Sequence, residues 1–147
     1  MPKNRVSLVV ASTVIFVAGF SLGTVFRPTA GVHAQANARV FELRTYTAPA
    51  GKLADLEARF RNHTVDIFNR HGMTSIGYWV PQDAPLSQNT LTYILAHPSR
   101  EAAAKNWVDF RADPEWQKVA AESQVNGTLV DKVESVFMDP TDFSSIK

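Results

Sequence analysis

Three polar side chains spaced two residues apart, Glu42, Arg44 and Tyr46, form the pattern in this sequence that is best suited to chemistry. Successive side chains of a β-strand point to opposite faces, so these three share one face of a predicted strand. If that face is the open side of a sheet, the three side chains line a cavity against a partner molecule. Arg44 would then bind a carboxylate or an enolate, and Glu42 or Tyr46 would transfer a proton. We favour the alternative, a buried ion pair that fixes the register of a dimer.

His71 is the fourth catalytic candidate, because histidine is the side chain most easily tuned to titrate near neutral pH. It ends a predicted helix, where a protonated imidazole interacts favourably with the helix dipole, and we favour this structural role. His63 lies eight residues earlier, too far along the helix to share a metal ion with His71. No set of His, Asp and Glu residues has the spacing of a metal site, so we predict no metal and assign no cofactor.

Aromatic side chains provide a second kind of candidate site. We take Tyr78, Trp79 and Tyr93 as candidate ligand-binding residues, which together with Trp107 and Trp116 would line an aromatic pocket. Packing in the core and at an interface is the interpretation that we favour for these rings, above all for the two tryptophans on a helix stripe.

Hydrophobic periodicity predicts the elements that would position these residues. Alternation predicts strands, and in the second strand it places Ile76, Tyr78 and Val80 on one face. A period of 3.6 residues predicts a continuous helix that closes at Gly72 and a second helix that is broken in the middle. Ser99 and Asp113 are the expected N-caps of the two parts of this broken helix. The predicted strands span residues 39–46, 74–80, 90–96 and 130–138, and the predicted helices span residues 52–71 and 99–126.

The order of these elements, βαββαβ, predicts an α+β fold of the ferredoxin-like type. In this fold a four-stranded antiparallel sheet carries both helices on one face. The other face is left open although it bears large side chains, and an exposed face of this kind is usually an interface. We therefore expect a symmetric homodimer in which a second copy covers the open face.

Composition limits the possible functions. The chain has 147 residues, 45% of them hydrophobic, which is enough for one domain with its own core. A net charge of +1 argues against nucleic acid as a partner. With no cysteine, the chain has neither disulfides nor a thiol nucleophile.

The first 34 residues have the order of an export signal. Lys3 and Arg5 precede an apolar run over residues 6–26, and a stretch of small residues then ends at Ala34. We expect cleavage after Ala34 and a periplasmic or secreted protein. The alternative is a retained signal anchor, which would hold the domain outside the inner membrane through residues 6–26. Residues 35–38 would be a linker and residues 39–147 the domain.

A set of short motifs resembles the NIPSNAP family over residues 39–143. The motifs are FELRTY at 41–46, GKL at 51–53, HGM at 71–73, IGYW at 76–79, YILAHPSREA at 93–102, WVDFRADPEW at 107–116 and VES at 133–135. The resemblance implies a dimeric α/β barrel built from ferredoxin-like halves, in agreement with the strand and helix pattern. It implies no settled activity, and the N-terminal export segment is not part of the family domain.

Three functions remain open. The one we favour is an exported domain that binds a small hydrophobic or aromatic ligand, or a protein partner, in the barrel. The second is an enzyme of the cofactor-free monooxygenase or haem-dependent type known for such barrels, an analogy at the level of the fold. The third is a membrane-tethered module that uses its open sheet face to bind another protein.

Overall fold

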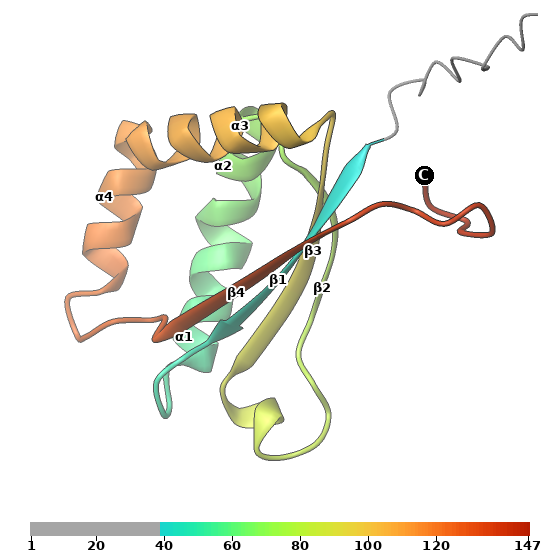
Figure 1. Cartoon of the computed structure of the whole chain (residues 1–147). Helices are drawn as coiled ribbons and strands as arrows, with labels where there is room; N and C mark the ends of the chain where they lie inside the picture. Colours follow the sequence, from blue (N-terminus) through green and yellow to red (C-terminus); the bar gives the residue numbers. More distant parts are fainter. Residues whose placement is uncertain (1–38) are drawn as a thin grey trace, which may run out of the picture. The chain divides into compact units, whose positions relative to one another are not determined.

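The computed structural model describes residues 39–147, which form a four-stranded antiparallel sheet covered on one face by helices (Figure 1). The predicted signal segment and linker lie outside the described residues. Within residues 39–147, no helix has the length and apolar character needed to span a membrane.

The predicted βαββαβ order is confirmed, and the strands lie in the order β2-β3-β1-β4. The strands are β1 (Val40–Thr47), β2 (Thr74–Trp79), β3 (Thr90–His97) and β4 (Lys132–Met138). The helices are α1 (Leu53–Arg59), the π-helical segment η1 (Phe60–Thr64), α2 (Val65–Arg70), the short 3₁₀ helix η2 (Leu86–Gln88), α3 (Arg100–Ala112) and α4 (Pro114–Ser123).

The predicted helix ends are confirmed by their capping interactions. The Ser99 side chain accepts a hydrogen bond from the backbone N–H of Ala102, and Asp113 accepts from the N–H groups of Glu115 and Trp116. Gly72 follows α2 with a φ of 72°, a left-handed conformation that glycine adopts without strain.

The first helix differs from the prediction, because it is interrupted by one π-helical turn between α1 and α2. The hydroxyl of Thr64 donates to the carbonyl of Arg59, five residues earlier, at 3.2 Å. Leu56, Phe60 and Ile67 stay buried on either side of this wider turn, so the helix keeps one apolar face across the interruption.

Strand β2 also differs from the prediction, because a β-bulge interrupts its pairing with β3 between Ser75 and Gly77. Ser75 and Tyr78 thus share the helix-covered face, and their hydroxyl groups form a hydrogen bond of 2.7 Å. The expectation that Ile76 and Tyr78 lie on one face is wrong, since the extra residue reverses the alternation.

The two faces of the sheet have different surroundings. On β1, Glu42, Arg44 and Tyr46 point toward the helices, whereas Leu43 points to the open face. There Leu43 is paired with Ile94 of β3 and Val136 of β4. The helix-covered side holds the core, in which a nearly continuous set of aromatic rings joins sheet and helices. Its members include Tyr46, Phe60, Phe68, Tyr78, Tyr93, Trp107, Phe110 and Trp116.

The cap of α3 gives a test of this architecture. We expect Ser99→Ala to lower the free energy of unfolding by about 1 kcal/mol, because the N–H of Ala102 loses its acceptor. Ser99→Asp keeps an acceptor oxygen at the cap and should retain the wild-type stability. Urea denaturation of the three proteins measures the difference. Equal stability of the Ala variant would show that this cap contributes nothing.

Candidate functional site

The carboxylate of Glu42 lies at the centre of a buried polar cluster between the sheet and α3. It is 1% exposed and accepts four hydrogen bonds. Arg44 Nη1 and Ser135 Oγ donate to Oε1, each at 2.7 Å. Trp107 Nε1 and His97 Nε2 donate to Oε2, at 2.7 and 3.1 Å. One side chain thereby connects three strands and a helix.

These contacts determine the charge of Glu42. Burial by itself would raise the pKa of this carboxyl, but the hydrogen bonds from His97, Ser135, Trp107 and Arg44 outweigh it and lower the pKa to about 2. The group is therefore ionised at neutral pH. A carboxylate with so low a pKa is a weak base, and its two oxygen atoms are already occupied by donors. Glu42 is therefore unsuited to proton transfer.

Arg44 is equally committed to structural contacts. Besides its ion pair with Glu42, its guanidinium carbon lies 4.2 Å from the centre of the Trp107 ring, a cation–π contact. Its Nη2 lies 3.4 Å from the hydroxyl of Tyr46. The structure therefore brings the predicted trio together, but on the helix-covered face. The expectation that these residues line a cavity between the sheet and a partner molecule is wrong.

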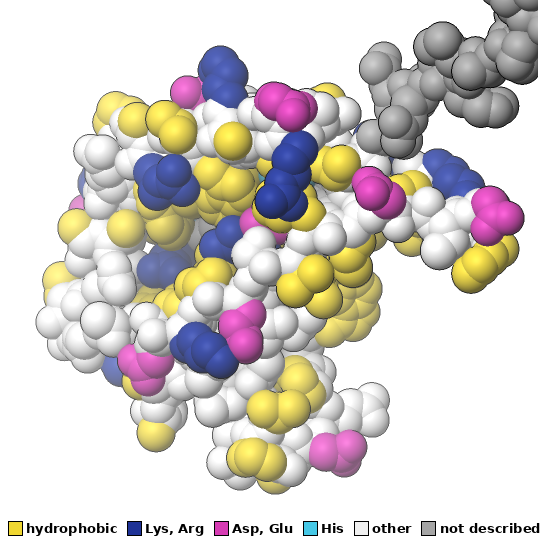
Figure 2. Space-filling view, viewed as in Figure 1, with side chains coloured by type: hydrophobic (Ala, Val, Ile, Leu, Met, Phe, Trp, Pro, Cys, Tyr) yellow, Lys and Arg dark blue, Asp and Glu magenta, His cyan; other side chains and the backbone are white. Residues whose placement is uncertain are grey.

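Tyr46 is the member of the trio that lines a cavity. This inner cavity, about 190 Å³ in volume, lies between β1, β4, the first helix and α4. Five aromatic side chains contribute to its wall: Tyr46, Phe60, Phe68, Phe110 and Trp116. The remaining lining residues are Arg59, Thr64, Gln124, Val130 and Val133. Figure 2 shows a hollow beside α4 in which basic side chains are framed by hydrophobic ones.

The π-helical turn and its first neighbour supply three of these lining residues. Arg59 ends α1, while Phe60 and Thr64 are the first and last residues of η1, and all three are at most 7% exposed. In a regular α-helix Thr64 would share a face with Phe60, four residues earlier, but not with Arg59, five residues earlier. The extra residue of the π turn lets all three contribute to the cavity wall, and such turns often occur at functional sites.

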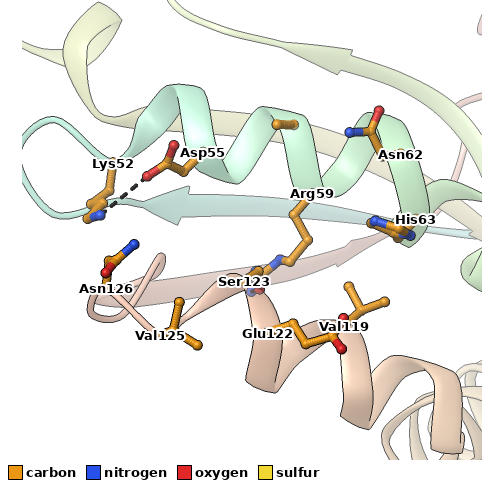
Figure 3. Close-up of a pocket in the computed structure, with 11 residues that line it drawn as sticks. Lys52, Asp55, Arg59, Asn62, His63, Val119, Glu122, Ser123, Val125 and Asn126 are labelled. Carbon is orange, nitrogen blue, oxygen red and sulfur yellow. Dashed lines mark hydrogen bonds and ion pairs between the residues drawn. The ribbon is translucent and has the colours of Figure 1, made fainter.

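A second depression, the outer groove, lies on the other side of Arg59 and has a volume of about 380 Å³ (Figure 3). Its walls are the first helix and α4 with the segment that follows it. The polar residues that line it are Lys52, Asp55, Arg59, Asn62, His63, Glu122, Ser123 and Asn126. Arg59 is common to the inner cavity and the outer groove, so it lies at the boundary between an aromatic compartment and a polar one.

His71 contacts the N-terminal cap of α4. Its Nε2 lies 2.7 Å from Oδ2 of Asp113, the N-cap residue of α4. Arg70 also contacts this carboxylate, at 3.1 Å. Several hydrogen bonds lower the pKa of Asp113, and the one from His71 has the largest effect. The end of α2 is thus joined to the junction between α3 and α4, and none of these three side chains lines either depression.

The three aromatic candidates do not form one site. Tyr93 is fully buried in the core, stacked on Tyr78 with ring centres 5.5 Å apart, and its hydroxyl has no hydrogen-bond partner. Burial raises the pKa of both phenols. Trp79 is 51% exposed and lies at the edge of the sheet, where it lines a shallow depression with Tyr78. Their assignment as ligand-binding residues stays a prediction.

Sequence reasoning did not identify Arg59 or Phe60 as site residues. Both lie within the predicted helix over residues 52–71, where an apolar residue normally packs into the core and a charged residue normally lies on the exposed side. The π-helical turn begins directly after Arg59, but the sequence contains no proline or glycine that marks it.

Within residues 39–147, no three metal-ligating side chains come together. A haem-dependent site would need a histidine facing the inner cavity. The described histidines lie elsewhere: His71 contacts Asp113, His97 contacts Glu42, and His63 lines the outer groove.

The sheet order and the helix-covered face define a ferredoxin-like half of the kind found in dimeric α/β-barrel proteins. The chain belongs to the NIPSNAP family, whose family model matches residues 41–145. The predicted fold class and the family resemblance are therefore both confirmed.

Several solved structures share the fold. A NIPSNAP family protein of unknown function from Agrobacterium tumefaciens is 22% identical, with a TM-score of 0.66 over 76% of this chain and 96% of that one. A second NIPSNAP family protein from A. tumefaciens is 25% identical, with a TM-score of 0.65 over 74% and 99% of the two chains. An uncharacterised NIPSNAP-like domain protein from Burkholderia xenovorans is 20% identical, with a TM-score of 0.64 over 74% and 90%. No curated protein matches the chain.

The low pKa of Glu42 predicts how stability depends on pH. A carboxyl whose pKa is lowered by folding stabilises the folded state above its unfolded-state pKa, and this contribution is lost as the pH falls from about 5 to about 2. Glu42→Gln should therefore lower the free energy of unfolding at pH 7 by about 3 kcal/mol, and its difference from wild type should shrink toward pH 2.

The measurement is chemical denaturation of wild type and variant at a series of pH values. Glu122→Gln, which neutralises an exposed carboxylate on α4, is the matched control and should follow the wild-type curve closely. A Glu42→Gln curve that runs parallel to wild type at all pH values would contradict the prediction.

Proposed function

We propose that this NIPSNAP domain binds a small hydrophobic or aromatic molecule in its inner cavity. The observation that carries the proposal is the composition of the cavity wall, in which five aromatic rings line a space of about 190 Å³. Ligand sites are typically apolar concavities with a few polar groups that orient the ligand, here Arg59, Thr64 and Gln124.

The volume defines the size of the ligand. An apolar cavity of about 150 Å³ is large enough for benzene, so the inner cavity has room for one ring with a small substituent. Edge-to-face contacts already join the rings around it, such as Tyr46 with Phe60 at 5.9 Å between ring centres. A planar ligand would extend this arrangement, since aromatic pairs stabilise one another beyond the area that they bury.

Filling the cavity tests the proposal. The full-length chain is exposed to single-ring compounds, both neutral and charged, and binding is followed by saturation-transfer NMR. At least one compound should bind, and Val130→Phe should weaken its binding at least tenfold, because the new ring occupies the cavity. Val108→Phe, at an exposed position of α3, is the control. The proposal fails if no single-ring compound binds, or if Val130→Phe binds as well as wild type.

We also propose that two copies of the chain associate through the open face of the sheet. In the single chain this face exposes 55% of Val136, with Leu43 and Ile94 beside it. A symmetric pair would remove these apolar side chains from water, and it would leave the inner cavity of each copy on the opposite side of its sheet.

A charge on the open face tests the dimer. Val136→Asp should yield a monomer, because association would bury an unpaired carboxylate. Val108→Asp places the same charge on α3 at a position that is 57% exposed, so it should remain dimeric. Sedimentation equilibrium measures both masses against the 16.3 kDa of one chain. A monomeric wild-type protein would overturn the assignment of this face.

A further inference from the structure

Arg59 is a buried cation at the boundary between the two depressions. Arg59 is only 7% exposed, although charged helix residues usually face the solvent. The side chain extends from α1 toward Ser123 of α4 (Figure 3), where Nη1 lies 3.5 Å from the Ser123 hydroxyl, a long contact. The guanidinium carbon lies 5.2 Å from the centre of the Trp116 ring. Nε is buried and has no hydrogen-bond partner.

No carboxylate of residues 39–147 lies within ion-pair distance of Arg59. Two acidic side chains line the outer groove, but each is paired with a nearby lysine. Asp55 lies 3.3 Å from Lys52, and Glu122 lies 3.9 Å from Lys118.

Arg44 is a buried guanidinium that does have an internal counter-ion, and it provides a comparison with Arg59. It lies in the same layer and has the carboxylate of Glu42 at 2.7 Å. The pKa of Arg44 is raised, because Tyr46, Tyr93 and Glu42 together outweigh its burial. The pKa of Arg59 is lowered, because burial prevails over the same two tyrosines. Arginine nevertheless remains charged, so Arg59 is a desolvated cation without an internal counter-ion.

We infer that the inner cavity binds an aromatic carboxylate with a single ring, and that Arg59 binds the carboxylate group. The ring lies among the aromatic side chains of the wall, and the carboxylate lies at the boundary with the outer groove. This inference rests on the proposed function, and it adds the charge of the ligand and the residue that selects it.

The chemistry of the two groups supports this pairing. A guanidinium presents a planar set of N–H donors that matches the two oxygen atoms of a carboxylate, and Nε of Arg59 is free to take part. Burial excludes competing water, so the contact is stronger than at the surface. The carboxylate of the ligand also supplies the counter-ion that Arg59 lacks within residues 39–147. The outer groove gives the ligand a polar path to Arg59.

The experiment compares benzoate with benzyl alcohol, a neutral compound of similar size and shape. Each is titrated into the full-length chain by isothermal calorimetry at pH 7. We expect wild type to bind benzoate at least tenfold more tightly than benzyl alcohol, since hydrogen bonds to charged groups are the strong ones. Arg59→Met should bind the two compounds equally. Arg61→Met, two residues further along at an exposed position, should keep the preference for benzoate.

The stability of the unliganded proteins gives a second readout. If Arg59 had a structural ion-pair role, Arg59→Met would unfold at a lower temperature. We expect an unchanged or higher unfolding temperature, because the substitution removes an unpaired buried charge. A clear loss of stability, or equal affinity of wild type for benzoate and benzyl alcohol, would overturn the inference while leaving the cavity as a neutral aromatic site. If neither these two compounds nor any other single-ring compound binds, the proposed function itself fails.

Discussion

The burial of the Glu42 carboxylate is the constraint on which the rest of the helix-covered layer depends. An ionised carboxylate that is removed from water must recover the hydrogen bonds of its hydration shell. Here the donors come from β1, β3, β4 and α3, so all four elements must be in place before the charge is satisfied. The free-energy cost of leaving this carboxylate without donors therefore favours one distance between α3 and the sheet, and one pairing of β4 with β1.

This arrangement also determines the electrostatics of the layer. Two arginines lie within it, Arg44 and Arg59, and Glu42 is the acidic side chain buried with them. Because Glu42 is fully occupied by its four donors, it neutralises Arg44 and leaves Arg59 without a partner. A protein selected for stability alone would gain by replacing Arg59 with an apolar side chain. Packing alone therefore gives no reason for a charge at this position, which is in line with the ligand that we propose.

The sequence predicted the elements better than it predicted their surroundings. Local signals have local physical causes, and for that reason the caps at Ser99 and Asp113 and the closing Gly72 could be identified from single residues. The π turn could not, since it inserts one residue into a periodic pattern without a marker residue. The β-bulge does have a marker, because Gly77 is an isolated glycine inside a strand pattern, but alternation alone does not reveal the extra residue. In each irregularity a side-chain hydroxyl makes a short-range contact: Thr64 donates to the carbonyl of Arg59, and Ser75 shares a hydrogen bond with Tyr78.

The same limit explains why the candidate site was placed on the wrong side of the sheet. Alternation correctly grouped Glu42, Arg44 and Tyr46 on one face, but it does not reveal which face the helices cover. Charged residues usually mark the solvent side of a strand, and here they lie inside because Trp107 of α3 donates to Glu42. The partner that reverses the expectation is 65 residues away in the sequence, beyond the reach of any local pattern.

Strand β1 shows why the two sheet faces can serve different purposes. Its alternate residues supply the buried charge and the cavity tyrosine on one side, and the apolar surface around Leu43 on the other. A slip of one residue in its pairing would exchange the two sets, exposing Leu43 to the helices and leaving Glu42 without its donors. The four hydrogen bonds to Glu42 penalise that slip strongly, because a buried charge would lose all of its partners. The polar cluster thus keeps the helix-covered face and the open face on their separate sides of the sheet, and this role requires no chemistry of Glu42 itself.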